Sequence, residues 1–173
     1  MALLVDDLLL LSRLDAGRLQ LQKQPVEAAE LLEAVRRQAS ALAEQRGVGV
    51  AVDGASGTIM GDPTRLRQVL LILLDNALRH TPAGGTVALS ARPAGRDVRV
   101  AVADTGEGIP PEHLPHIFER FYRASSDRGE ESGGSGLGLS IARGLVEAHH
   151  GHIGISSEPG KGTRVEMTLP AAG

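Results

Sequence analysis

The sequence predicts an α+β fold, a two-layer α/β sandwich in which helices cover one face of a mixed sheet, with a further helix at the N-terminus. The helical and strand-like segments do not alternate strictly along the chain, which favours helices gathered on one face. The chain has 173 residues, of which 42% are hydrophobic, and a chain of this size buries roughly 70% of the surface that its unfolded form exposes. We therefore expect one core, formed without disulfides because the sequence contains no cysteine.

The composition excludes several function classes. The formal net charge of −3, from 18 Lys and Arg against 21 Asp and Glu, gives too weak a field to favour nucleic acid or an anionic membrane as a partner. The aromatic residues are only Phe118, Phe121 and Tyr122, too few for stacking along a nucleic-acid strand. Acidic and polar residues interrupt the leucine-rich start of the chain well short of the about 18 apolar residues that a membrane span needs. We therefore expect a cytoplasmic chain that makes no membrane contact itself.

The first 24 residues are expected to form a helix and a linker. Leu4, Leu8 and Leu11 fall on one face of a helix, which suits packing against other helices. Both an ordinary amphipathic helix and part of an oligomerising bundle fit this pattern. A Gln-Pro pair then interrupts it, so we assign the helix and linker to residues 1–24 and the main domain to residues 25–173.

The elements of the main domain follow from periodicity and from capping residues. Gly47 ends one helix, and Asp62 caps the next, which begins at Pro63. Helical spacing predicts helices over residues 26–46, 63–82, 112–121 and 137–150, and period-two alternation predicts strands over residues 48–52, 87–91, 98–102, 153–157 and 163–169.

Asp104 is the first candidate site residue. It continues the alternation of the valines before it, so its carboxylate is expected on the buried face of the sheet, where an unpaired charge is costly. It therefore needs a hydrogen-bond donor. The turn that follows contains Gly106 and Gly108, whose missing side chains would let a flat ligand lie against the backbone. The alternative is that Asp104 only caps its own turn.

A polar stripe on the helix that ends at His80 is the second candidate. Ile72, Asn76 and either Arg79 or His80 lie on one face. An amide oxygen beside a cation could hold a hard metal ion and phosphate oxygens, since Mg²⁺ prefers oxygen ligands. A solvated asparagine is the alternative.

A glycine-rich segment is the third candidate. Residues 133–139 open a helix, and the free N–H groups and positive dipole end of a helix start attract an anion. Residues 124–135 are too poor in apolar side chains to pack firmly. We expect a mobile lid there, with an ordinary surface loop as the alternative.

Four segments resemble, in order and spacing, the N, G1, F and G2 boxes of sensor histidine kinases. Residues 160–170 resemble that family's last strand, and residues 5–17 are similar to the end of the second helix of its dimerisation and phosphotransfer domain. The resemblance covers residues 25–170. The four boxes are Leu73–Pro82, Asp104–Pro110, Phe118–Arg123 and Gly134–Leu139.

The resemblance implies a Bergerat-type nucleotide fold, with about three helices on one face of a mixed, mostly antiparallel sheet, that binds ATP and Mg²⁺. It implies that Asp104 accepts a hydrogen bond from the adenine amino group and that Asn76 ligates Mg²⁺. Arg79 would contact phosphate, and Arg123 would reach the γ-phosphate. The other implied nucleotide contacts are His80, Gly106, Gly108, Ile109, Phe118, Phe121, Tyr122, Gly134, Ser135, Gly136, Leu137, Gly138, Leu139 and Thr163.

Three of these positions carry more specific expectations from the resemblance. Phe118 and Phe121 would attach the lid to the core. Thr163 would lie beside Asp104 near the adenine, since it shares the inward parity of the residues that follow it. His80 stands where the family often stacks a tyrosine on the base.

Ile72 departs from the pattern of the family. Sensor kinases usually carry an asparagine at this place, and related ATPases such as gyrase B and the heat-shock chaperones carry a catalytic glutamate. Without a carboxylate here, activation of water is not expected. Without the asparagine, Mg²⁺ would lose one contact or replace it with water.

The six histidines lack the context of a phosphoacceptor, because none is followed by a Glu- or Asp-x-Arg-x-Pro pattern. We therefore expect a histidine supplied in trans. His149, His150 and His152 flank a helix end without a convergent fourth ligand, so we do not interpret them as a metal site.

The resemblance therefore implies the catalytic domain of a two-component sensor histidine kinase, which transfers the γ-phosphoryl group of Mg-ATP to a partner histidine. Its expected partners are a histidine-containing dimerisation domain, in cis in a full-length kinase or in trans, and a response regulator, and a homodimer through the N-terminal helix is left open. One alternative is a related ATPase. The other is a catalytically weak nucleotide-binding interaction module.

Overall fold

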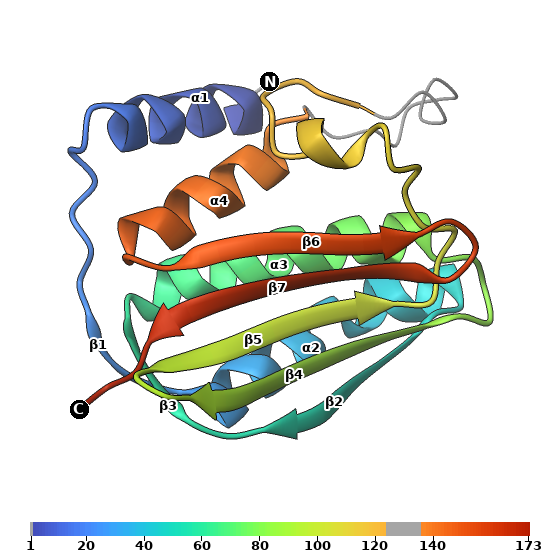
Figure 1. Cartoon of the computed structure of the whole chain (residues 1–173), viewed down its shortest axis with the longest axis horizontal. Helices are drawn as coiled ribbons and strands as arrows, with labels where there is room; N and C mark the ends of the chain where they lie inside the picture. Colours follow the sequence, from blue (N-terminus) through green and yellow to red (C-terminus); the bar gives the residue numbers. More distant parts are fainter. Residues whose placement is uncertain (1, 124–135) are drawn as a thin grey trace.

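The computed structural model describes residues 2–123 and 136–173, with the side chains of residues 2 and 3 left aside. Figure 1 shows the order of the elements along the chain. They are α1 (Ala2–Asp15), β1 (Gln24–Glu27), α2 (Ala28–Arg46), β2 (Gly49–Ala55), β3 (Thr58–Gly61), α3 (Pro63–His80), β4 (Thr86–Ala94), β5 (Asp97–Asp104), the 3-10 helix η1 (Leu114–His116), α4 (Gly138–Ala148), β6 (His152–Glu158) and β7 (Gly162–Pro170).

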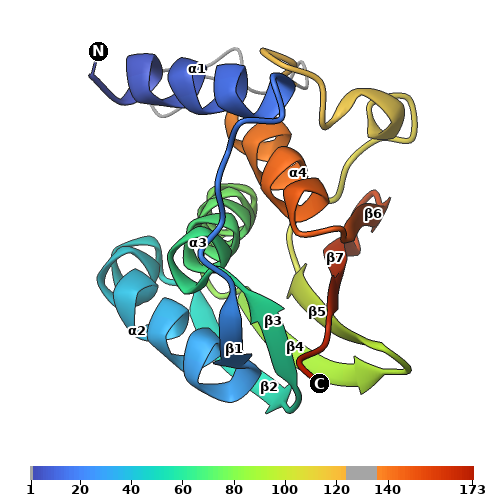
Figure 2. The same cartoon turned by 90° about the vertical axis from the view of Figure 1, so that its left-hand side faces the viewer.

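The main sheet has the strand order β2-β4-β5-β7-β6. β2 runs parallel to β4, and every other neighbouring pair is antiparallel. Helices α2, α3 and α4 lie on one face of this sheet (Figure 2). The expected two-layer α+β sandwich with a mixed, mostly antiparallel sheet is therefore confirmed.

The core fills the space between the sheet and the three helices. Along β5, Val98, Val100 and Val102 are each at most 2% exposed, as period-two alternation requires of a strand with one buried face. On α3 the apolar residues recur at helical spacing and point to the sheet. The largest fully buried side chains are Leu32, Ile59, Leu66, Leu70, Leu73, Leu74, Leu78, Leu89, Leu137, Ile141, Leu145 and Met167.

Two features differ from the sequence prediction. β1 and β3 pair as a small antiparallel sheet that was not expected, because strands of four residues give too little alternation to recognise. The helix expected over residues 112–121 is wrong: only Leu114–His116 form a 3-10 turn. Pro115 lies within this segment, and proline removes a donor and blocks an α-helix beyond its first turn.

Helix α1 packs on α4. A Cβ atom added at Gly144 would lie 2.8 Å from Cδ1 of Leu14, so the two helices meet closely where α4 has no side chain. Arg120 Nη2 lies 2.5 Å from Asp15 Oδ1, which ties the end of α1 to the segment after η1. The division of the chain at residue 24 stays a prediction.

The outer face of α1 leaves apolar side chains in solvent: Leu4, Val5, Leu8 and Leu9 are between 37% and 55% exposed. Even so, none of the helices in the described part of the chain is long and apolar enough to cross a membrane.

Candidate nucleotide-binding site

Asp104 ends β5 on the face of the sheet that carries the helices. It pairs in register with Thr163 of β7, and Thr163 pairs with Ser157 of β6. The three side chains therefore form a row across three neighbouring strands, because residues in register share a face. The expected placement of Thr163 beside Asp104 is confirmed.

The two oxygens of the Asp104 carboxylate have different surroundings. Oδ1 accepts the main-chain N–H groups of Gly106 at 2.8 Å and Thr163 at 3.3 Å. Oδ2 accepts no hydrogen bond from any residue of the described ranges. Burial raises the pKa of Asp104, and the two N–H groups oppose this effect only in part. Asp104 thus caps its own turn with one oxygen, and the other oxygen accepts no hydrogen bond within the described ranges.

The turn after Asp104 is held between α3 and the β6–β7 hairpin. A Cβ atom on Gly106 would lie 2.3 Å from the carbonyl oxygen of His80, and one on Gly108 would lie 2.3 Å from that of Glu158. Gly108 also has a φ of +76°, which favours glycine. Ile109 N–H donates to Ser157 Oγ at 2.7 Å. Both glycines are therefore required by close approach of backbone to backbone.

The polar residues of α3 lie at its C-terminal end. Asn76 is half-buried, and its side chain makes no hydrogen bond within the described ranges. Arg79 Nη2 lies 2.7 Å from Asp75 Oδ2 one turn earlier, and its other N–H donors make no contact with Asp75. His80 Nδ1 lies 3.3 Å from Glu107 Oε1 in the turn after β5.

Asn76 also decides whether this site fits a magnesium ion. The described ranges contain no group of three or more His, Cys, Asp or Glu side chains placed to hold a metal ion. Mg²⁺ at a nucleotide site, however, takes most of its ligands from phosphates and water and needs only one or two protein oxygens. The uncommitted side-chain oxygen of Asn76 fits that requirement.

Ile72 lies one turn before Asn76 and faces the start of α4. Its Cγ2 atom is 3.2 Å from the position that a Cβ atom of Gly138 would take. At position 72, an apolar side chain therefore lies between α3 and the first turn of α4. This side chain has neither an amide nor a carboxylate group.

The segment with Phe118, Phe121, Tyr122 and Arg123 follows η1 and meets the chain before α4 at Gly136. The expectation that Phe121 packs on the core is wrong: its side chain is 60% exposed. Phe121 has a φ of +62°, and its backbone approaches that of Gly136, with the N–H of Phe121 donating to Gly136 O at 2.9 Å. Phe118 is half-buried and Arg123 is exposed.

Tyr122 contacts two histidines of the same segment. Its hydroxyl forms a hydrogen bond with Nδ1 of His113, and its ring centre lies 5.5 Å from that of His116. The polar and ring contacts of Tyr122 are therefore with residues of its own segment.

The glycine-rich segment is described only from Gly136 onward. Gly134 and Ser135, together with the lid expected over residues 124–135, lie outside the described residues. Leu137 is fully buried directly before α4, Gly138 is the first residue of that helix, and Leu139 packs partly against the core. α4 therefore begins within this segment, as the sequence predicts.

His149 is a buried structural residue. It is 0% exposed, Nδ1 donates to Leu145 O at 2.7 Å, and Nε2 accepts the N–H of Asp62 at 3.1 Å. Burial lowers its pKa, in agreement with a neutral ring. Because both ring nitrogens are used, His149 cannot ligate a metal with His150 and His152, which are exposed.

Sequence reasoning missed Ser157. Its hydroxyl contacts Ile109 N, Gly162 O and Thr163 Oγ1 within 2.9 Å. The strand alternation that places Thr163 inward also places Ser157 inward, so this residue could have been found by pairing the last two strands in register.

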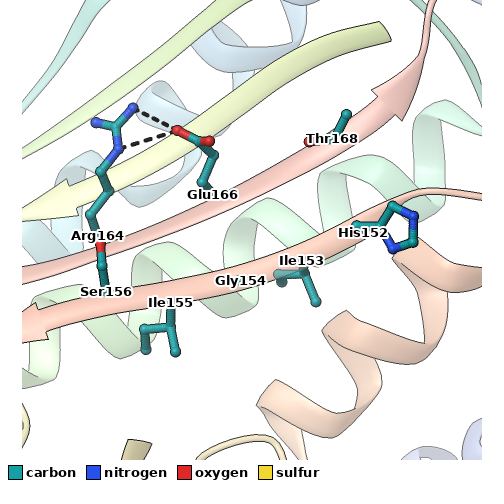
Figure 3. Close-up of a pocket in the computed structure, with 8 residues that line it drawn as sticks. All are labelled: His152, Ile153, Gly154, Ile155, Ser156, Arg164, Glu166 and Thr168. Carbon is teal, nitrogen blue, oxygen red and sulfur yellow. Dashed lines mark hydrogen bonds and ion pairs between the residues drawn. The ribbon is translucent and has the colours of Figure 1, made fainter. Parts of the chain in front are cut away.

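A shallow hollow of about 380 Å³ lies over β6 and β7. Figure 3 shows its residues, among them Arg164 and Glu166, which are joined by hydrogen bonds. Arg164 and Glu166 have the opposite strand parity to Thr163 and therefore lie on the face of the sheet away from the helices. The hollow is thus separate from the row formed by Asp104, Thr163 and Ser157.

Comparison with known proteins agrees with this geometry. Residues 61–173 match the family described as histidine kinase-, DNA gyrase B- and HSP90-like ATPases, and the chain belongs to that family. ATP binding is implied by membership of a family of ATPases.

The similar proteins within this family are sensor histidine kinases. The chain is 40% identical over 171 residues to the sensor histidine kinase CusS of Escherichia coli (strain K12), covering 99% of this chain and 35% of CusS. It is 42% identical over 168 residues to the sensor protein DivL of Caulobacter vibrioides, covering 96% of this chain and 21% of DivL. The chain thus spans about a third or less of the length of these relatives.

A solved structure is also similar. Full-length ShkA, crystallised in complex with AMPPNP, superposes with a TM-score of 0.87 at 37% identity, covering 98% of this chain and 35% of ShkA.

Proposed function

We propose that this chain is the catalytic part of a sensor histidine kinase, which binds Mg-ATP and transfers the γ-phosphoryl group to a histidine of a separate dimerisation domain. The observation that carries the proposal is Oδ2 of Asp104, which accepts no hydrogen bond within the described residues, while Oδ1 is fixed by the N–H of Gly106. Asp104 is half-buried, and an acceptor without a partner in the protein can take a donor from a ligand; the adenine amino group is such a donor.

The residues around this acceptor supply the remaining parts of the site. Asn76 would hold Mg²⁺ through its side-chain oxygen, and the ion would neutralise charge on the phosphate oxygens. Arg79, which contacts Asp75 through Nη2, would donate its other N–H groups to a phosphate. Arg123, which is exposed, would reach the γ-phosphate. These groups act by positioning and by electrostatic stabilisation, which is how phosphoryl transfer is mainly catalysed.

The acceptor of the phosphoryl group is expected to be a neutral imidazole. Its nitrogen is nucleophilic without a strong base, so the reaction does not need a carboxylate at position 72. Water does need such a base, and Ile72 supplies none. Ile72 therefore favours transfer to histidine over hydrolysis, although a related ATPase remains the second candidate function.

The same reasoning supports the proposed partners. His149 is buried with both nitrogens engaged, and none of the other histidines stands in an H-box pattern. We therefore assign the phosphoacceptor to a dimerisation domain, in cis in a longer kinase or in trans, from which a response regulator would take the phosphoryl group. We also propose that the apolar outer face of α1, formed by Leu4, Val5, Leu8 and Leu9, pairs with a second copy of the chain.

Labelled ATP with a separately purified H-box helix domain tests this proposal. Label on the histidine of that domain, absent when the Asp104→Asn variant replaces the chain, is the expected result. Steady release of labelled phosphate without the acceptor would instead support the ATPase. Nucleotide binding with neither transfer nor hydrolysis would support an interaction module and overturn the kinase assignment.

A further inference from the structure

Ser157 is the centre of a hydrogen-bond cluster that joins the turn after β5 to the β6–β7 hairpin. Its Oγ atom accepts the N–H of Ile109 at 2.7 Å and lies 2.9 Å from Gly162 O and 2.8 Å from Thr163 Oγ1. The side chain is half-buried. The Ser157 hydroxyl therefore has three polar contacts within the protein.

The single proton of Ser157 determines the direction of every bond in this cluster. The carbonyl oxygen of Gly162 can only accept, so the Ser157 hydroxyl donates to it. Because that proton is then used, the contact between the two hydroxyls requires Thr163 to donate to Ser157 Oγ. Ser157 thus accepts from Ile109 and Thr163 and donates to Gly162.

The direction of these bonds changes what Thr163 can offer to a ligand. With its proton turned toward Ser157, the Thr163 oxygen has only lone pairs left. Thr163 is in register with Asp104, whose free Oδ2 is also an acceptor. The site therefore presents two neighbouring acceptors on the same face of the sheet.

We infer that Ser157 is a positioning residue that makes the Thr163 hydroxyl an acceptor beside Asp104, so that the site selects a purine with an exocyclic amino group over one with an oxo group. This inference rests on the proposed nucleotide-binding function. An amino group carries two N–H donors and matches two acceptors. An oxo group at the same position would face Asp104 Oδ2 and the Thr163 oxygen, so three acceptors would meet without a donor. Sites whose buried polar groups would be left without partners discriminate strongly against such a ligand.

A purely structural role for Ser157 makes a different prediction. If Ser157 only held the turn through Ile109, its loss would loosen the site and weaken all nucleotides by the same factor. If it also sets the direction of the Thr163 hydroxyl, its loss frees that hydroxyl to rotate and donate to an oxo group. The ratio of the two affinities then changes, and this ratio separates the two roles.

Titration calorimetry of the full chain with Mg-ATP and Mg-GTP measures that ratio. The wild-type chain should prefer ATP, and Ser157→Ala should narrow the preference by about tenfold, the effect of one hydrogen bond. Ser157→Thr keeps the hydroxyl and should restore the preference. The neighbouring Ser156→Ala, at an exposed position of opposite parity, should leave it unchanged.

A second variant keeps the test valid if Ser157→Ala does not fold. Thr163→Val removes the acceptor but leaves the bond from Ile109 to Ser157, and it should also narrow the preference. An unchanged ratio in these variants, with both affinities lowered equally, would overturn the inference and leave the proposed function intact. Failure of the wild-type chain to bind either nucleotide would instead reject the proposed function.

Discussion

Asp104 and Gly106 are joined by a 2.8 Å hydrogen bond from the Gly106 N–H to Asp104 Oδ1, which determines how the carboxylate is oriented. In the Asp104→Asn variant, the amide oxygen must take the place of Oδ1. An NH₂ group in that place would face the N–H donors of Gly106 and Thr163. The NH₂ group then points into the site, where it opposes another donor. We expect ATP affinity to fall by about 100-fold or more, as measured by calorimetry.

The same variant should not unfold the protein. Burial raises the pKa of Asp104, so the fold disfavours its ionised form. This stabilising effect of the proton is present below the ordinary pKa of 3.8 and lost as the pH rises through the folded value. At neutral pH the uncharged Asn should therefore keep the free energy of unfolding within about 1 kcal/mol of wild type or raise it. Asp97→Asn at the other end of β5 is the control for ATP affinity, and equal affinities in the two variants would contradict the adenine assignment.

Gly106→Ala should damage both the site and the fold. The added Cβ would lie 2.3 Å from His80 O and 2.9 Å from Asp104 Oδ1, so the turn must move away from α3. Overpacking of this kind typically costs about 1–3 kcal/mol, measurable by urea unfolding, and nucleotide binding should be lost. Gly154→Ala, where a Cβ meets nothing within 4 Å, should change the stability by less than about 0.5 kcal/mol. Similar losses in both variants would show that the close approach is not responsible.

Local sequence signals predicted much of this architecture. Asp62 caps α3 through the N–H groups of Thr64 and Arg65, as a residue of this type before a proline indicates. Strand parity predicted that Asp104 and Thr163 both face inward, and the resemblance to sensor kinases placed the two side by side. The roles of the site residues toward ATP and Mg²⁺, however, stay predictions.

What the sequence did not predict depends on contacts between distant segments or on single backbone angles. The pairing of β1 with β3 joins segments more than thirty residues apart, and neither strand has an alternation of its own. The φ of +62° at Phe121 turns its side chain into solvent, and an aromatic residue gives no local signal for such an angle. Ser157 gains its importance only when two strands are paired.

Ile72→Asn should strengthen magnesium binding. An amide at this position adds an oxygen one turn from Asn76, whereas the isoleucine offers none. We expect the Mg²⁺ concentration for half-maximal phosphoryl transfer to fall by about tenfold, the effect of one additional polar contact. Ile72→Ala removes the side chain without adding an oxygen and is the matched control. If the alanine variant changes the magnesium dependence as much as the asparagine variant does, the oxygen is not the cause.

The exposed face of α1 should mediate self-association. Val5 and Leu9 are 55% and 54% exposed, and burying each would contribute about 1 kcal/mol or more. We expect sedimentation to detect dimers of the wild-type chain, and the combined Val5→Glu and Leu9→Glu changes to weaken the dimer by at least about tenfold. Ser12→Glu, on the same helix and exposed, controls for added charge. A wild-type chain that is monomeric at high concentration would exclude this interface.

His149 should make the stability of the fold depend on pH. In the folded chain Nε2 accepts the N–H of Asp62, and Asp62 Oδ2 in turn accepts the N–H of Gln22 in the linker after α1. Protonation of Nε2 would set a donor against a donor inside the core, and burial lowers the pKa of His149 below the ordinary 6.5. The hydrogen bond to Leu145 O opposes this decrease, as does the charge of Asp62, whereas nearby Lys23 and His150 lower the pKa further.

The sign of the pH effect follows from proton binding. Below pH 6.5 the unfolded chain binds a proton at His149 that the folded chain does not, so the free energy of unfolding falls as the pH decreases from 6.5 toward the folded pKa. Above pH 6.5 both states are neutral at this residue, and its effect is constant. Urea unfolding at a series of pH values from 8 to 5 measures the slope. His149→Gln keeps hydrogen-bonding capacity but cannot titrate, so it should flatten the slope in this range, whereas His150→Gln at the exposed neighbouring position should not. If both variants keep the wild-type dependence of the free energy of unfolding on pH, a group other than His149 causes it. Protonation of His149 would then not destabilise the fold despite its hydrogen bond with Asp62.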